Sequence, residues 1–314
     1  MKIIVTHASP DWDAIGSVWL IKKYLAGWER AEVRFVPAGE NISKIKDQRS
    51  KIKDPVERIG EDEVVHVDTG MGPLDHHQTS DREVCAMSRT WDFVRNEIES
   101  KDNALTDNHL KAISRIVRVV VDIDHFGEVY WGEPTADYHE FSLLGVLEGL
   151  KYIKQDQDEF YVEFGMQCLD ALVADFENRI WAEDEIAKGQ KFVTRFGEGI
   201  GFETINDTVL KLAQKMGYIL VVRKDPRKKY VRIKARPHPD PLPRSGRGQA
   251  LKGEGTGRGI DLTLAYEQLK KIDPEATWYL HVSKKMLLNG TPKNPKMRPT
   301  KLGLDVIIKV LEKI

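Results

Sequence analysis

Short apolar runs alternate with amphipathic stretches through the first half of the chain, and this alternation limits the folds that the sequence can adopt. Apolar runs at 2–7, 31–37 and 63–69 are typical of buried strands, and the stretch at 14–25 is typical of a helix. Strands that alternate with helices form parallel sheets, because each crossover returns the chain to the same direction. The sequence therefore predicts an α/β domain with a parallel sheet and helices on both faces.

Further helices are expected at 86–100 and 107–124, and a long helical region is expected at 141–192, interrupted near 154–158. After the glycine-rich sequence "GEGIG" the spacing of apolar residues changes, and a smaller α+β domain is expected. Its predicted elements are a hairpin, a helix, a strand and a closing helix, at 218–237, 262–271, 277–282 and 301–313. We therefore divide the chain into two predicted domains, 1–195 and 196–314.

A stretch rich in proline and glycine interrupts the second domain. Residues 237–259 hold four prolines, six glycines and no aromatic residue. Such a composition buries too little apolar surface to offset the entropy of ordering the chain. We therefore expect a flexible insert there.

Composition excludes several classes of protein. With 41% apolar and 31% charged residues among 314, the chain can form a sizeable core. No apolar run approaches the roughly 18 residues of a membrane span, and no secretory leader is visible, so the sequence predicts no membrane partner and a cytoplasmic location. Cys85 and Cys168 lack the spacing of a zinc site and suit a reducing compartment.

The net charge of −1 conceals two oppositely charged halves. Residues 201–314 contain 24 Lys and Arg against 11 Asp and Glu, so by difference residues 1–200 contain 24 against 38. A basic half beside an acidic half suggests a polyanionic substrate held against cations bound to carboxylates. Solvated surface charge, with some pairing between the domains, is the alternative.

Aspartates and histidines gather where the predicted strands and helices end. In open α/β sheets ligands bind beyond the carboxyl ends of the strands, so these side chains are candidates for one site. Crowded carboxylates repel one another unless cations neutralise them, which favours bound divalent metal ions. For Asp13, capping of the helix that follows is the alternative. The groups are His7, Asp11 and Asp13; Asp68; Asp75, His76 and His77; and Asp122, Asp124 and His125.

Three of these stretches, "HASPDWDAIGS", "VDTG" and "LDHHQ", resemble in this order the motifs of the DHH phosphoesterase superfamily. The resemblance covers roughly residues 1–130. This superfamily includes oligoribonucleotide phosphatases, cyclic-dinucleotide phosphodiesterases and manganese-dependent inorganic pyrophosphatases. The short spacing between "VDTG" and "DHHQ", together with the later "VVDIDHFG", resembles that of a group of relatives that includes exonucleases acting on RNA. A "GGGH" motif, common in the C-terminal domain of many relatives, is missing.

The resemblance implies two divalent cations. One would be held by His7, Asp11 and Asp68, and the other by Asp13, Asp68, His76 and one aspartate of "DID", with Asp68 bridging the two. The helical stripe of 107–124 continues through Asp124, whereas Asp122 falls on the opposite face, which favours Asp124 as the ligand. Mixed carboxylate and imidazole ligation favours Mn²⁺, with Mg²⁺, Co²⁺ or Fe²⁺ as alternatives.

Two catalytic roles follow from the same resemblance. His77 would contact the phosphate, because neighbouring side chains on an extended segment point to opposite sides and His76 is the implied ligand. Asp75 would accept a hydrogen bond that orients a histidine. Trp12 stands where relatives often carry a small residue, and either it packs in the core or it offers a stacking face to a base.

The basic C-terminal region supplies candidate residues for substrate binding. Lys284, Lys285, Arg298 and Thr300 precede the closing helix, where free backbone amides and cations suit a phosphate, although an ordinary helix cap is the alternative. Arg232 lies on a predicted strand with alternating basic residues. That strand is either a track for a nucleic-acid backbone or an edge strand protected by charge.

The sequence thus predicts a two-metal phosphoesterase that uses activated water to hydrolyse phosphodiester or phosphomonoester bonds of a nucleotide or short single-stranded nucleic acid, as a nuclease does. An inorganic pyrophosphatase is the first alternative, since the same metal motifs would serve it. A non-catalytic nucleotide sensor is the second. A homodimer remains open as the assembly.

Overall fold

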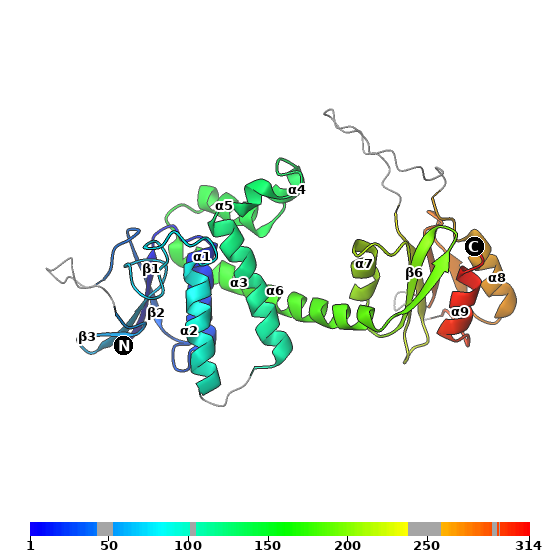
Figure 1. Ribbon diagram of the computed structural model, residues 1–314, viewed down its shortest axis with the longest axis horizontal. Coiled ribbons are helices and arrows are strands. Elements are labelled where there is room, and N and C mark those ends of the chain that lie inside the picture. Colours follow the sequence, from blue (N-terminus) through cyan, green and yellow to red (C-terminus); the bar gives the residue numbers. More distant parts are fainter. Residues whose placement is uncertain (43–52, 101–104, 238–258, 291–293, 295) are drawn as a thin grey trace. The chain divides into compact units, whose positions relative to one another are not determined.

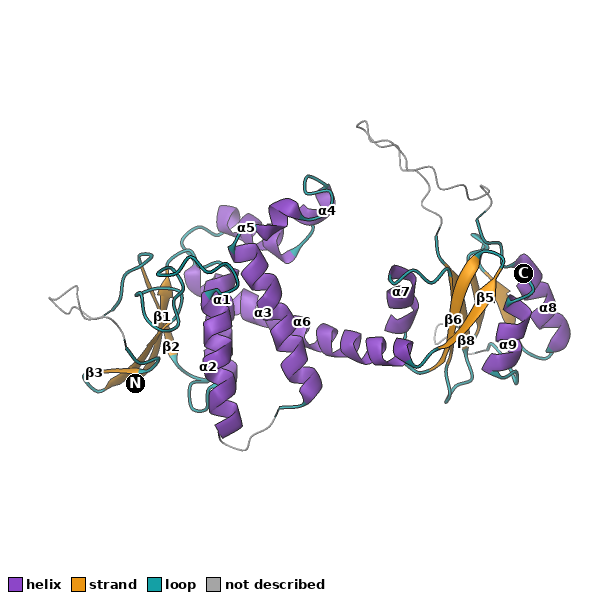
Figure 2. Cartoon of the chain, in the orientation of Figure 1, coloured by secondary structure: helices purple, strands orange, loops and turns teal. Residues whose placement is uncertain are grey.

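The computed structural model describes residues 1–42, 53–100, 105–237, 259–290, 294 and 296–314, and the chain forms two compact units, 1–177 and 178–314 (Figure 1). Helices dominate the first unit and a broad sheet the second (Figure 2). The observed class is mixed α/β. The insert expected at 237–259 lies, apart from its two end residues, outside the described residues.

A four-stranded sheet in the order β2-β1-β4-β3 underlies the first unit. Its central strand β1 (Lys2–His7) is parallel to both neighbours, β2 (Glu32–Val36) and β4 (Asp62–His66). The edge strand β3 (Glu57–Ile59), which the sequence pattern does not predict, is antiparallel. Because β1 and β4 run in the same direction, the residues that follow them emerge at one edge of the sheet.

Three helices pack together beside this sheet (Figure 1): α1 (Trp12–Tyr24), α2 (Ala86–Ser100) and α3 (Asp107–Asp124). The amphipathic pattern of α3 buries one stripe, which includes Ile113 and Val120, and leaves the opposite face to solvent.

The expectation of helices on both faces of the sheet differs from the described structure. On the second face, Ile3, Val5 and Val64 form a small apolar cluster that Ile42, from the loop after β2, helps to cover. The described residues between β2 and β3 form no helix, and they include two prolines, Pro37 and Pro55, and Gly39, all of which disfavour a helix interior.

The remaining helices of the first unit follow α3 along the chain. They are the short 3₁₀ helix η1 (Gly127–Tyr130), α4 (Asp137–Glu140) and α5 (Leu143–Ile153). The long helix α6 (Asp158–Ala187) begins in the first unit, and the boundary between the units falls within it. It ends five residues earlier than predicted, just before Gly189, where a side chain would collide with Phe202 and Ile200.

The second unit is built on a six-stranded sheet in the order β5-β6-β7-β8-β10-β9. Within this sheet, only the β6–β7 pairing is parallel among the described strands. The strands are β5 (Gln190–Thr194), β6 (Gly197–Glu203), β7 (Leu220–Lys224), β8 (Val231–Ala235), β9 (Trp278–Leu280) and β10 (Met286–Asn289).

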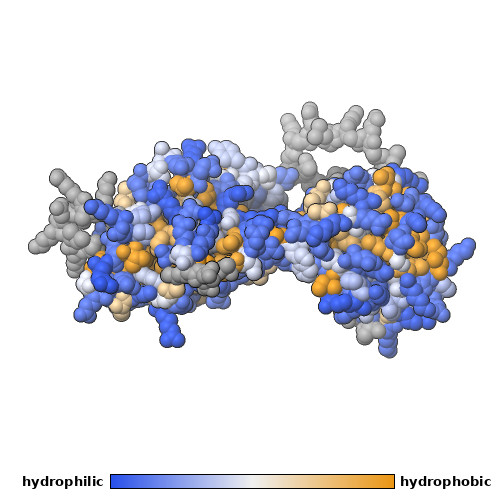
Figure 3. Space-filling view, turned by 60° about the horizontal axis from the view of Figure 1, so that its bottom comes forward, coloured by the Kyte–Doolittle hydropathy of each residue, from blue (hydrophilic) through white to orange (hydrophobic). Residues whose placement is uncertain are grey.

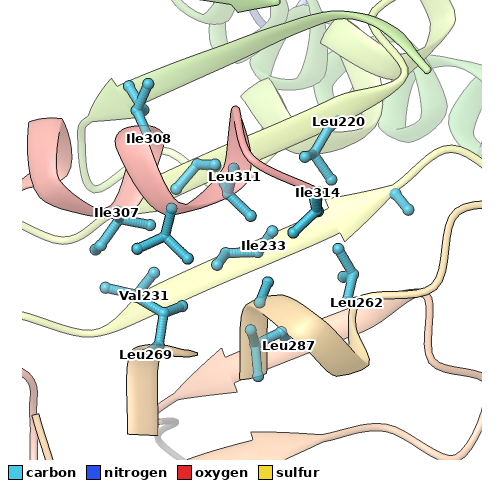
Figure 4. Packing of buried hydrophobic residues seen from close by; sticks show 14 of the residues in the cluster. Leu220, Val231, Ile233, Leu262, Leu269, Leu287, Ile307, Ile308, Leu311 and Ile314 are labelled. Atoms are coloured by element: carbon cyan, nitrogen blue, oxygen red, sulfur yellow. The ribbon is translucent and has the colours of Figure 1, made fainter. Parts of the chain in front are cut away.

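Helices cover both faces of this second sheet. On one face, α8 (Thr263–Ile272) and α9 (Leu304–Leu311) enclose the larger apolar cluster, which contains Ile233 and Leu287 of the sheet, Leu269 of α8 and Ile307 of α9 (Figure 4). On the other face, the end of α6 and α7 (Thr208–Lys215) pack on Ile200, Phe202 and Val221. The predicted hairpin is present as β7 and β8.

On the face that Figure 3 shows, both units are mostly hydrophilic, with smaller apolar patches between the polar side chains. Among the described helices, none has both the length and the apolar character to cross a membrane.

Candidate metal centre

The first edge of the site is the turn from β1 into α1. His7 is the last residue of β1, and Asp11 caps α1 by accepting hydrogen bonds from the backbone amides of Asp13 and Ala14, at 2.9 and 3.0 Å. This is the ordinary geometry of an N-terminal cap. The capping residue of α1 is therefore Asp11, and Asp13 is left with its carboxylate inside the fold.

Asp13 caps a different helix. Its two carboxylate oxygens accept from the backbone amides of Ala86 and Met87, at 2.8 and 2.6 Å, at the start of α2. The residue before α2 is Cys85, which is not a capping residue, so a carboxylate from elsewhere in the chain satisfies these amides. The sequence analysis missed this contact, and the missing local cap of α2 was the available signal.

Asp68 occupies the middle of the site. It follows β4 by two residues and adopts the left-handed conformation with φ of 53°, which Asp tolerates better than most residues. Its carboxylate is nearly inaccessible, with Oδ2 at 3.1 Å from His7 Nε2 and Oδ1 at 3.7 Å from His76 Nε2. The two oxygens of one carboxylate thus face two different histidines.

The adjacent histidines have different surroundings. His76 is buried, and its Nε2 lies 3.5–3.7 Å from carboxylate oxygens of Asp13, Asp68 and Asp124. The side chain of His77 is 53% exposed, and its Nδ1 lies 2.7 Å from Oδ1 of the fully buried Asp75. The inward histidine therefore belongs to the carboxylate cluster, and the outward one presents its other ring nitrogen away from Asp75.

Asp75 also anchors the loop that carries both histidines. Its carboxylate accepts from the backbone amides of Met71 and His77, at 2.7 and 3.1 Å. Burial raises the pKa of Asp75, but these bonds and the imidazole of His77 outweigh burial and hold the pKa below its usual value. Burial lowers the pKa of His77, and the hydrogen bond and charge of Asp75 outweigh that effect and raise it.

At the end of α3, Asp124 and Asp122 separate. Asp124 faces His76, whereas Asp122 is exposed and accepts a hydrogen bond from Nε1 of Trp131 at 2.7 Å. The cluster therefore includes Asp124 and excludes Asp122. His125 lies beside the cluster, and its Nε2 contacts the carbonyl oxygen of Val84 at 3.0 Å.

Three polar atoms at the centre have no hydrogen-bond partner in the described part of the chain. They are Oδ1 of Asp68, Nε2 of His76 and Oδ2 of Asp124, and all three are buried. Buried polar atoms in folded proteins are normally paired, since an unpaired one costs on the order of 1–3 kcal/mol. Carboxylate and imidazole are common ligands of divalent transition metals, so a cation between these atoms would satisfy all three at once.

The charges of the cluster support the same interpretation. Burial, and to a lesser extent repulsion by Asp68 and Asp124, raises the pKa of Asp13 well above its usual value. Burial also raises the pKa values of Asp68 and Asp124. Burial lowers the pKa of His7, but its hydrogen bond to Asp68 and the neighbouring charges outweigh this and raise it to about 9. The cluster therefore holds protons that a divalent cation would displace.

Three combinations of these residues place potential ligand atoms within 4.8 Å of one another. They are His7 with Asp11 and Asp68, His76 with Asp124 and His125, and Asp68 with both His76 and His77. These combinations hold five of the six ligands inferred from the sequence, and the sixth, Asp13, lies 3.6 Å from Nε2 of His76. The six come from β1, α1 and its capping residue, α3 and the loop after β4.

The candidate substrate residues of the second unit do not converge in the same way. Lys284 and Lys285 lie at the turn between β9 and β10, where their Nζ atoms contact Asp261 and the carbonyl of Ile260. Arg298 and Thr300 lie beside Asn289, at the other end of this hairpin. The strand β10 separates the two ends by about 13 Å, because an extended strand rises about 3.3 Å per residue.

Thr300 and Arg232 both have partners within the fold. Thr300 is 2% exposed, and its hydroxyl donates to the carboxylate of Asp273 at 2.6 Å. Arg232 forms an ion pair with Asp207 at 2.5 Å, and Arg223 contacts the other oxygen of the same carboxylate at 2.7 Å. The binding roles predicted for these residues remain predictions.

Comparisons with known proteins add little to this geometry. No protein-family model matches the chain, and no curated protein matches it. These searches assign the chain to no family. A solved structure from Methanococcus jannaschii, provisionally described as a family II inorganic pyrophosphatase, aligns over 74% of this chain and 87% of its own, with 14% identity. Its TM-score of 0.19 is too low for the likeness to carry an argument.

Proposed function

We propose that this chain is a divalent-metal-dependent hydrolase of phosphoric esters or anhydrides. The observation that supports it is the set of three buried and unpaired atoms on Asp68, His76 and Asp124, which face one another across a gap too wide for hydrogen bonds. A merely structural polar cluster would pair these atoms.

The residues of the cluster divide into two sets around Asp68. His7 and Asp11 lie on the Oδ2 side, and His76 and Asp124 lie on the Oδ1 side, so each set suits one cation. When bound, the two cations supply positive charge that activates water and stabilises the charge of a phosphoryl group during displacement. Asp13 contributes a carboxylate that α2 holds in place through two backbone amides.

His77 is the residue placed to contact a phosphate oxygen. Asp75 fixes its ring through Nδ1, and this leaves Nε2 as the nitrogen available to a ligand. The raised pKa of His77 favours the cationic ring, which donates to an anionic oxygen. Because Asp75 is fully buried and bonded to the backbone, the orientation of His77 is set before substrate arrives.

Two substrate classes fit this site. A short nucleic acid or nucleotide is the substrate predicted first from the sequence, and inorganic pyrophosphate is the alternative. The cluster itself does not separate them, because both present a phosphoryl group to the same ligands. Substrate choice therefore depends on residues outside the cluster.

The test measures binding of Mn²⁺ by calorimetry and hydrolysis of pyrophosphate, of a nucleoside 3′,5′-bisphosphate and of short RNA. We expect two Mn²⁺ ions to bind, and Asp124→Asn to weaken the binding at least about ten-fold, as loss of a ligand does. Asp122→Asn is the matched control, because Asp122 lies on the opposite face of α3 from Asp124 and accepts a hydrogen bond from Trp131 instead. Equal Mn²⁺ binding by both variants, or no hydrolysis of any of the three substrates, would overturn the proposal.

A further inference from the structure

A cavity of about 490 Å³ opens beside the metal ligands, within the first unit. Asp11, Asp13 and Asp124 form part of its wall, so its contents would lie next to whatever the cluster holds. The volume is in the ordinary range for a site that binds a small organic molecule. Inorganic pyrophosphate would leave most of such a cavity unfilled.

Aromatic rings form much of the remaining wall. Trp12, Phe126, Trp131 and His139 line the cavity, and the rings of Trp131 and His139 lie 6.0 Å apart between centroids. A second, almost wholly apolar cavity of about 280 Å³ shares Trp12 and Trp131 with the first. Planar rings with an apolar floor are the surroundings in which nucleobases stack.

The position of Trp131 is fixed by the fold. Its indole nitrogen donates to Asp122 at 2.7 Å, and Asp122 in turn lies so close to Gly127 that a side chain there would meet its carboxylate at 2.0 Å. Glycine at 127 is therefore required for the contact that holds the ring. A rigid ring loses little entropy when a base stacks on it.

The charge of the cavity excludes a second phosphate. Residues 119–150, which supply most of its wall, contain seven Asp and Glu and no Lys or Arg. One of them, Glu128, has a buried carboxylate oxygen, Oε2, with no hydrogen-bond partner among the described residues. Such a wall repels phosphate but accepts a hydrogen bond from a neutral ligand that carries an N–H group.

We infer that this cavity binds the base and sugar of a nucleotide whose phosphate lies on the metal cluster. The base would stack on Trp131 and donate an N–H to Glu128. This inference rests on the function proposed above, because the cavity would be the nucleoside subsite of a phosphohydrolase. Such a subsite selects nucleotides over pyrophosphate. Because no cation lines the cavity, it takes the terminal nucleoside of a strand rather than a segment with further phosphates.

An aromatic cavity with carboxylates also suits an organic cation, through cation–π contacts. We favour the nucleoside because the cavity shares wall residues with a second, apolar cavity and adjoins a cluster suited to phosphate. The test must therefore distinguish binding of a nucleoside from binding of an organic cation.

The test measures binding of adenosine, guanosine, cytidine and uridine to the full chain by equilibrium dialysis, without added metal. We expect at least one nucleoside to bind at millimolar concentration, and Trp131→Ala to weaken it about ten-fold or more, as loss of a stacking ring does. Trp181→Ala, in an exposed part of α6, is the matched control and should not change the affinity. Glu128→Gln should weaken binding, whereas Glu133→Gln, in the same segment but outside the cavity wall, should not.

A second variant keeps the test decisive if Trp131→Ala unfolds. Leu144→Trp adds a large ring to a position that lines both cavities and should abolish nucleoside binding while Mn²⁺ binding remains. Absence of binding by all four nucleosides, unchanged affinity in these variants, or preferential binding of tetramethylammonium would overturn the inference. Failure of hydrolysis would overturn only the proposed function, because nucleoside binding is measured without metal and should persist in Asp68→Asn.

Discussion

Nδ1 of His77 lies 2.7 Å from Oδ1 of Asp75, and this contact joins the exposed histidine to a carboxylate that solvent does not reach. The same carboxylate accepts from the backbone amide of Met71, so the ring of His77 is positioned by the loop that also carries His76. Because Asp75 positions His77, a substitution at Asp75 should change how His77 contacts the substrate.

We predict that Asp75→Asn lowers the rate of hydrolysis about 10- to 100-fold, the range for loss of a partner that orients a site residue. The charge that favours the cationic ring of His77 is lost, whereas Asn still accepts from the backbone. Steady-state rates measure the loss of hydrolysis, and Mn²⁺ calorimetry measures separately whether metal binding has changed. Asp81→Asn, in an exposed turn of the same region, is the control. Unchanged activity in Asp75→Asn would remove His77 from substrate binding.

We predict that Asp68→Asn abolishes turnover while the chain remains folded. Asn tolerates the left-handed backbone at this position, and its neutral side chain relieves the repulsion among the buried carboxylates. The variant should be at least as stable as the wild type without metal but should lose the stabilisation by Mn²⁺. For the wild type this stabilisation is about 2.7 kcal/mol for each bound Mn²⁺ at concentrations 100-fold above its Kd.

Thermal unfolding with and without Mn²⁺ measures this difference. A variant that still gains stability from Mn²⁺ to the wild-type extent would show that Asp68 does not join the two sets of ligands.

Elements with a clear apolar period could be predicted from the sequence. The helix at 86–100 is observed with the same bounds, and α3 likewise spans 107–124, because the buried stripe of each helix is continuous. The glycine-rich strand β6 could not be recognised, because isolated glycines weaken a strand pattern.

The packing explains these glycines. A side chain at Gly199 would collide with the ring of Phe192, and one at Gly201 would meet Ile308 of α9. Ile308 is far away in the sequence, and Phe192 meets Gly199 only because β5 pairs with β6 in this register, so a local pattern cannot reveal either neighbour.

The gathering of the candidate metal ligands was predictable for a different reason. Parallel strands end at one edge of a sheet, so His7 and Asp68 could be placed together from strand order alone. The contact of Asp13 with α2 and the cavity lined by Trp131 depend on how helices pack, and neither has a local sequence signature. Sequence reasoning thus located the cluster but not the wall beside it.

We predict opposite effects of alanine at two helical glycines. In Gly165→Ala of α6, the new methyl group would lie 2.5 Å from Cγ2 of Ile15, which is fully buried and stiff, so the free energy of unfolding should fall by about 1–3 kcal/mol. In Gly149→Ala of α5, nothing lies within 4 Å, and the higher helix propensity of Ala should raise it by up to about 1 kcal/mol. Chemical denaturation measures both, and destabilisation by Gly149→Ala would contradict the helix geometry.

The last prediction concerns the dependence of stability on pH in the second unit. Burial raises the pKa of Asp273, but the hydrogen bonds from the Thr300 hydroxyl and the Lys301 amide outweigh it and hold the pKa below its usual value near 4. A carboxyl whose pKa is lower in the folded state stabilises that state above its unfolded pKa, and this stabilisation is lost as the pH falls through the folded pKa.

The wild type should therefore have a higher free energy of unfolding than Asp273→Asn. This difference should be at its full size at pH 7 and should disappear as the pH falls below about 4. Melting temperatures of both proteins across this range measure the difference, and subtraction removes the titration of other carboxylates. Glu267→Gln, at an exposed position on α8, is the control and should track the wild type at every pH. If the gap between the wild type and Asp273→Asn stayed constant down to pH values well below 4, the hydrogen bonds from Thr300 and Lys301 would not favour the ionised carboxylate of Asp273.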